Sequence, residues 1–154
     1  MALPTLFEVC SPRPDILEGK VAESDFAADL ARVIRRDAPD EYQNPVKFFA
    51  NTHPTRGLKE LLASVCQRLQ GSSDQIGSIF RLDTNYGGGK THSLIALIHV
   101  VEGMVGVDNA AEFIDSALVP TGPVRVAAFD GENADPTNGR LLGDGLRAKP
   151  LGES

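Results

Sequence analysis

The stretch TNYGGGKTHS, residues 84–93, places three adjacent glycines, a lysine and a threonine directly before an apolar run. The phosphate-binding loop of nucleotide-binding proteins reads Gly-x-x-x-x-Gly-Lys-Ser/Thr and lies between a strand and a helix. Residues 89–91 match its last three positions, whereas Thr84 stands where the first glycine is expected. The two further glycines next to this match supply backbone freedom nearby. The pattern therefore indicates a variant phosphate-binding loop.

The residue types of this loop suit the chemistry of a nucleoside triphosphate with magnesium. In such loops the backbone amides cradle the phosphates, the lysine reaches the β and γ phosphates, and the hydroxyl binds Mg²⁺. We therefore expect Lys90 to be the catalytic cation and Thr91 to be the metal ligand. The residues expected to bind ATP are Thr84, Asn85, Tyr86, Gly87, Gly88, Gly89, Lys90, Thr91 and His92.

An ordinary glycine turn before a core helix is the alternative interpretation. Glycine is enriched just past helix C-termini rather than three in a row at an N-terminus. A lysine in the first helical turn is also unfavourable against the helix dipole unless an anion compensates it. Both considerations favour anion binding. The dinucleotide pattern Gly-x-Gly-x-x-Gly fails, because His92 occupies the third glycine position.

The other candidate residues are two histidines and two acids. His92 and His99 are seven residues apart and should lie on one face of a helix. They lack a third metal ligand at suitable spacing, so we interpret them as histidines of the core or of the surroundings of the site. His92, directly after Thr91, is also placed to touch the loop or the nucleotide. Asp130 ends an apolar stretch and Glu132 follows it, which superficially fits a magnesium-directed acid. A solvated acid at a strand end is the favoured interpretation. A calcium loop is disfavoured because Ala134 occupies a ligand position.

Composition limits the function classes. The chain has 154 residues and a formal net charge of −6, with no basic tract. Binding to nucleic acid or to a membrane surface depends mainly on positive charge. We therefore expect neither for this chain. Two cysteines are too few for a disulfide scaffold. No signal peptide or membrane-spanning run is found, so the expected compartment is the cytosol.

The order of apolar patterns and breakers predicts an α/β fold. We expect a helix over 23–36 with Ser24 as its N-cap, and helical turns around 41–49. Further expected elements are helices over 56–70, 90–101 and 108–119 and strands over 76–83 and 122–130. Two strands joined by a helical crossover form a βαβ unit in a parallel sheet. The predicted organisation is a helical segment, 1–74, followed by an incomplete P-loop core, 75–154.

Several stretches together resemble the N-terminal part of a family of large bacterial ATPases, long described only as a domain of unknown function. They are FEVCSPRPDILEG, SDFAADLARVI, NPVKFFANTHPTRGLKELL, LDTNYGGGKTHSLIALIHV and VAAFDGENADP, and the likeness spans about residues 7–145. Members of that family look like AAA+-type P-loop ATPases that accompany DNA methyltransferases in phage-defence loci, including relatives of BREX systems. The absent first glycine looks like a trait of that family.

The resemblance implies ATP and Mg²⁺ as ligands, with His92 in the nucleotide site, and a DNA methyltransferase or defence complex as partner. It also implies that the acid-bearing strand and any arginine finger of an ATPase would follow residue 154, so the chain looks like an N-terminal fragment. We accordingly expect nucleotide binding with weak hydrolysis or none, and an ATPase only when missing elements complete it. An inert or interaction-only module and a small P-loop kinase remain the alternatives.

Overall fold

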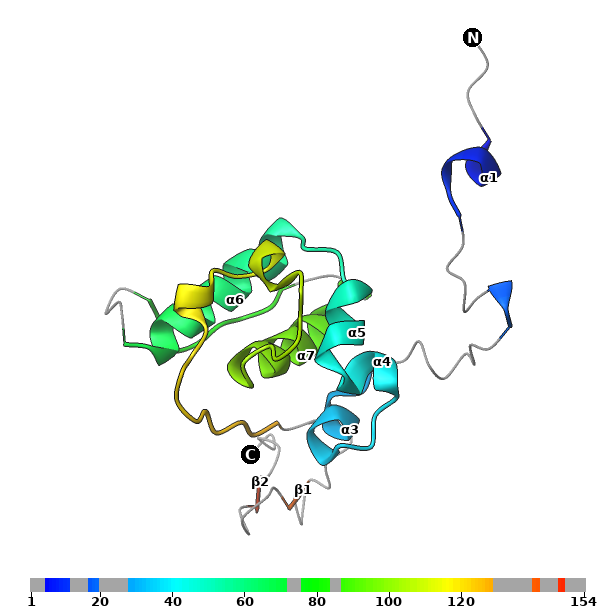
Figure 1. Ribbon diagram of the computed structural model, residues 1–154. Helices are drawn as coiled ribbons and strands as arrows, with labels where there is room; N and C mark the ends of the chain where they lie inside the picture. The colour runs from blue at the N-terminus through cyan, green and yellow to red at the C-terminus, as the bar shows by residue number, and fades with distance from the viewer. Residues whose placement is uncertain are drawn as a thin grey trace.

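The computed structural model describes residues 5–11, 17–19, 28–71, 76–83, 87–128, 140–141 and 147–148. Its helices and strands, labelled as in Figure 1, are α1 (Leu6–Val9), α3 (Leu30–Arg35), α4 (Asp40–Gln43), α5 (Pro45–Ala50), α6 (Arg56–Leu69), α7 (Lys90–Val101), the 3₁₀ turns η2 (Ala110–Glu112) and η3 (Ser116–Leu118), and the strands β1 (Arg140–Leu141) and β2 (Arg147–Ala148).

Polar side chains cap the N-termini of α3, α5 and α6. Asp29 caps α3 by accepting hydrogen bonds from the amides of Ala31 and Arg32, and Asn44 caps α5 in the same way. Pro45 occupies the first turn of α5, where its missing N–H is harmless. Thr55 caps α6 by accepting from the Leu58 amide at 3.3 Å. These caps satisfy amides that a helix leaves without an internal acceptor.

Helix α7 lies at the centre of the described body, between α6, α5 and α3 (Figure 1). Its sequence from residue 95 onward is almost wholly apolar, and Ile95, Ala96, Val100 and the polar His99 are buried. A helix that is apolar on all sides is stable only where neighbours cover it. The sequence of α7 therefore explains its central position.

One hydrophobic core joins residues from both halves of the chain. The largest fully buried side chains include Phe48, Phe49, Leu62 and Ile95. Phe113, which follows η2, packs edge-on against Phe49 with ring centroids 4.7 Å apart. Phe48 and Phe49 both belong to this core. The helical segment and the residues after 75 thus share this core.

The predicted α/β fold with a parallel sheet is wrong. Residues 76–83 and 123–128 adopt no strand, and the strands in the described ranges are the two-residue β1 and β2, which pair antiparallel. Ile79 is 89% exposed, and Val126 is 44% exposed. Their β-branched composition favours strands, but a strand needs a hydrogen-bonded neighbour, and neither segment pairs with the other. The described body is therefore helical, without a βαβ unit.

Two helix predictions also need correction. The described part of the first helix starts at Leu30 with Asp29 as its cap; Ser24 lies outside the described residues. The helix expected over 108–119 is replaced by η2 and η3, separated where Asp115 accepts from the Ala117 amide and starts a new turn. The helical turns around 41–49 and the helices over 56–70 and 90–101 are confirmed as α4, α5, α6 and α7.

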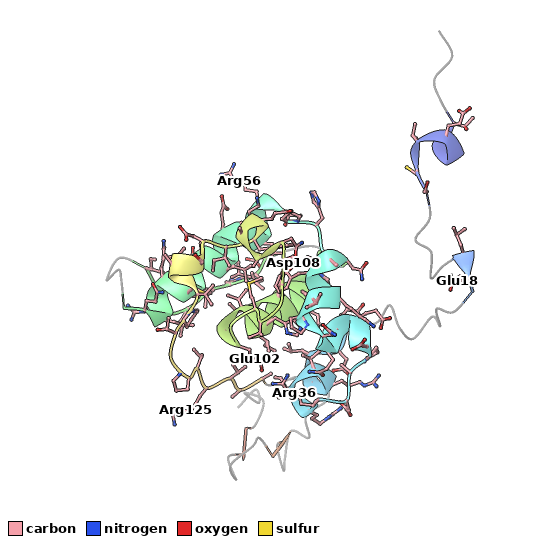
Figure 2. All side chains as sticks on the ribbon, in the orientation of Figure 1. Glu18, Arg36, Arg56, Glu102, Asp108 and Arg125 are labelled. Atoms are coloured by element: carbon pink, nitrogen blue, oxygen red, sulfur yellow. The ribbon has the colours of Figure 1, made fainter. Side chains whose placement is uncertain are left out.

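An exposed salt bridge connects α3 to the end of the central helix. Arg36, the C-cap of α3, donates from Nη2 to Glu102 Oε1 at 2.6 Å, and the two side chains lie side by side in Figure 2. Glu102 is the C-cap of α7. Arg36 adopts a left-handed conformation, with φ 64°, which ends α3. The contact joins residues 66 positions apart.

Candidate functional site

The glycine loop runs directly into the N-terminus of α7. Gly87 and Gly89 have φ values of +78° and +75°, in the left-handed region that glycine tolerates and other residues avoid. Gly89 is the N-cap of α7, and no side chain caps this end of the helix. The three glycines of residues 87–89 are exposed. An uncapped helix N-terminus preceded by exposed glycine backbone can present amide groups to an anion.

The side chains that follow the glycines differ in exposure. Lys90, the first residue of α7, is exposed, whereas Thr91 and Ser93 are half-buried. Ser93 Oγ donates to the Gly89 carbonyl at 2.9 Å, and the Ser93 amide bonds the same oxygen. The serine therefore braces the junction between loop and helix. The lysine carries the positive charge on the open side of that junction.

His92 is directed toward α5. Its ring stacks on Phe48 with centroids 4.4 Å apart and an interplanar angle of 27°. Its Nε2 lies 2.9 Å from Thr52 Oγ1. Burial lowers the pKa of His92, so the neutral ring is favoured at neutral pH. The side chain thus contacts the core beside the glycine loop.

His99 lies seven residues after His92 in α7 and is only 1% exposed. Its Nε2 donates to the Tyr42 carbonyl at 2.8 Å, and its ring lies near Phe48 with centroids 5.2 Å apart. Burial lowers the pKa of His99, although the hydrogen bond to Tyr42 opposes this effect. Because both histidines contact Phe48, their predicted position on one face of the helix is confirmed.

The structure brings together part of the predicted site. Residues 87–92 form one continuous loop-to-helix junction, whereas Thr84, Asn85 and Tyr86 lie outside the described residues. The acids considered as magnesium ligands, Asp130 and Glu132, lie outside them too. Across the described ranges, no three His, Cys, Asp or Glu side chains come close enough together to hold a metal ion.

The residue that sequence reasoning missed is Thr52. It lies 40 positions before His92, and no motif or periodicity links the two. Thr52 is half-buried and its hydroxyl also donates to the Phe48 carbonyl at 2.6 Å. Only the packing of α5 against α7 reveals that it contacts the predicted site.

The structure defines a helical body whose central helix carries an exposed glycine loop at its N-terminus. The family model of the DUF499 N-terminal domain matches residues 7–117, well over half of the chain, and the chain belongs to that family. The match includes the glycine loop and all of α7. A search of curated proteins and a search of solved structures found no match.

The helices of the described ranges are shorter than a membrane span. None of these helices combines the length and the apolar character needed to cross a bilayer. The longest described helix, α6, has 14 residues, whereas a span requires about 20.

Proposed function

We propose that the chain binds ATP, as its magnesium complex, at the glycine loop. The observation that carries the proposal is the left-handed conformation of Gly87 and Gly89 immediately before Lys90, at a helix N-terminus that no side chain caps. Exposed amides and the positive end of the helix dipole favour a phosphate group there. The local chemistry is that of an anion site, whatever the fold around it.

Each residue of the junction has a proposed part in binding. The amides of the loop would hold phosphate oxygens, and the ammonium group of Lys90 would offset their negative charge. The hydroxyl of Thr91 would ligate Mg²⁺, which prefers oxygen ligands. Magnesium would screen the charge of the triphosphate. Turnover would additionally need a group that orients the attacking water, so the proposal concerns binding.

The resemblance noted from the sequence supports ATP as the nucleotide. The GGGKTHS run is similar to that of ATPases found beside DNA methyltransferases in phage-defence loci. On that basis we propose a defence complex containing a DNA methyltransferase as the setting of the site. The chain itself carries a formal net charge of −6, which supports a protein rather than a nucleic acid as its direct partner.

Thermal unfolding with and without nucleotide tests the proposal. A ligand at about 100 times its dissociation constant stabilises a folded binder by about 2.7 kcal/mol. For a chain of this size that corresponds to a rise in melting temperature of about 5–10 °C. The scan should include MgATP, MgGTP and ATP without magnesium. MgATP should give the largest shift.

Lys90→Ala should abolish most of the shift, and Lys59→Ala is its matched control. Lys59 is also an exposed lysine near the start of a helix, α6, and lies away from the glycine loop in the sequence. Equal nucleotide shifts in the two variants would contradict the assignment of Lys90. A folded wild-type protein that ignores millimolar MgATP and MgGTP would refute nucleotide binding and favour an interaction-only module.

A further inference from the structure

The hydrogen bonds around Thr52 fix which ring nitrogen of His92 carries a proton. A hydroxyl has a single hydrogen to donate. Thr52 Oγ1 lies 2.6 Å from the Phe48 carbonyl oxygen, which can only accept, so the hydroxyl hydrogen points there. The contact of 2.9 Å between Thr52 Oγ1 and His92 Nε2 must then be donated by the histidine. His92 therefore carries a hydrogen on Nε2.

The His92 ring is held from two directions. Its face stacks on Phe48, which is itself 1% exposed and packed edge-on against Phe49. Its edge donates to Thr52, just beyond the end of α5. A ring restrained both by stacking and by a directed hydrogen bond has little rotational freedom. The contact therefore joins the first turn of α7 to the C-terminal end of α5.

We propose that His92 is a positioning residue: with Thr52 and Phe48 it forms a strut that fixes the glycine loop, instead of binding the phosphate itself. The inference rests on the proposed function, because it assigns a part to a residue beside the nucleotide site. His92 is the second residue after Lys90, in the same helical turn. Movement of this turn would displace the amides and the lysine that face the phosphate.

The contacts of the ring agree with this assignment. Its Nε2 is engaged by Thr52 and one of its faces is covered by Phe48. A ring nitrogen that already donates its hydrogen within the protein has no second hydrogen for a phosphate oxygen.

The first test uses the unaltered protein. Nitrogen NMR of ¹⁵N-labelled histidine distinguishes the Nε2–H tautomer from the Nδ1–H tautomer and from the charged ring. We expect His92 to be the Nε2–H tautomer, and to remain so when MgATP is added to saturation. A free protein with the Nδ1–H tautomer, or a His92 ring that becomes charged when nucleotide binds, would overturn the strut.

The second test removes the hydroxyl that receives the hydrogen bond. Thr52→Val has nearly the same shape without the hydroxyl, and Thr52→Ser is the matched control that keeps it. Without nucleotide, the valine variant should shift the backbone amide signals of residues 87–91, and the serine variant should leave them close to wild type. Unchanged loop signals in a folded valine variant would refute the positioning role.

The third measurement is nucleotide affinity. Loss of one hydrogen bond that orders the site should weaken MgATP binding about five- to tenfold in Thr52→Val. Thr52→Ser should stay within about twofold of wild type. Normal affinity in a folded valine variant would contradict the strut. Wild-type protein that binds no nucleotide would refute the proposed function. The tautomer of His92 and the amide signals of the loop, both measured without nucleotide, would still test the positioning role of His92.

Discussion

A methyl group added to the glycine loop tests its backbone conformation directly. Gly89 has φ +75°, and a Cβ built on it meets no atom within 4 Å. Gly57, in the first turn of α6, also has open space around a Cβ but lacks a positive φ. Gly89→Ala and Gly57→Ala therefore add the same atom without a clash, and they differ in backbone conformation.

The two variants should change stability in opposite directions. An alanine forced into the left-handed region destabilises the folded state by about 1–2 kcal/mol. An alanine in a helical conformation that suits it stabilises by about 0.4–1 kcal/mol, because the unfolded chain loses freedom. The free energies of unfolding of Gly89→Ala and Gly57→Ala should thus differ by about 2 kcal/mol.

Urea unfolding followed by circular dichroism measures this difference. With a denaturant slope of about 2 kcal/mol per molar urea, the two midpoints should lie about 1 M apart, on either side of the wild type. A Gly89→Ala protein as stable as wild type would show that the loop does not require a left-handed residue at this position. The basis of the anion site would then be lost.

Two further predictions concern buried groups. Because burial lowers the pKa of His99, the folded state favours the neutral ring, and its contribution to stability is present above the unfolded pKa of about 6.5. The free energy of unfolding should therefore fall as the pH drops below about 6.5. Below the pKa of His99 in the folded state, protonation of this residue should lower it no further. Urea midpoints that stay constant from pH 7.5 to pH 5 would contradict this. Cys66 is fully buried, with its pKa raised by burial, whereas Cys10 is exposed. A thiol reagent should therefore label Cys10 at once and Cys66 only after urea is added, and equal rates in native buffer would disprove that packing.

Local patterns in the sequence predicted the long helices well. The leucines and the valine between residues 58 and 69 recur at helical spacing, and Leu58 and Leu62 among them are buried in α6. The apolar run after the glycine loop likewise predicted α7. In both cases the information lies within one continuous stretch of chain.

The strands failed because their formation depends on partners that local composition does not reveal. Residues 76–83 have the residue types of a strand, yet Ile79 and Phe80 remain exposed, and no strand in the described part of the chain pairs with them. The helix expected over 108–119 failed for a related reason. The side-chain Nδ2 of Asn109 donates to the Phe49 carbonyl, and Phe113 enters the core between two short turns.

The candidate site likewise combines a local motif that the sequence displays with tertiary contacts that it does not reveal. The glycines and Lys90 form a continuous motif that the sequence displays, and the structure describes its second half as one junction. The partners of His92, by contrast, come from α5 and the residues after it. A contact across 40 positions is set by tertiary packing. The sequence therefore displays the glycine motif but not the contacts that hold His92 beside it.

The burial of the second half of α7, from Ile95 onward, has a consequence for how the chain exchanges amide hydrogens with water. Amides near Ile98 and Val100 lie in the most protected part of the described body, so they should exchange only when the whole domain opens. The glycine loop adjoins this slow region through a single helical turn. A ligand held by the loop would consequently slow exchange deep inside the protein, although it touches only the surface.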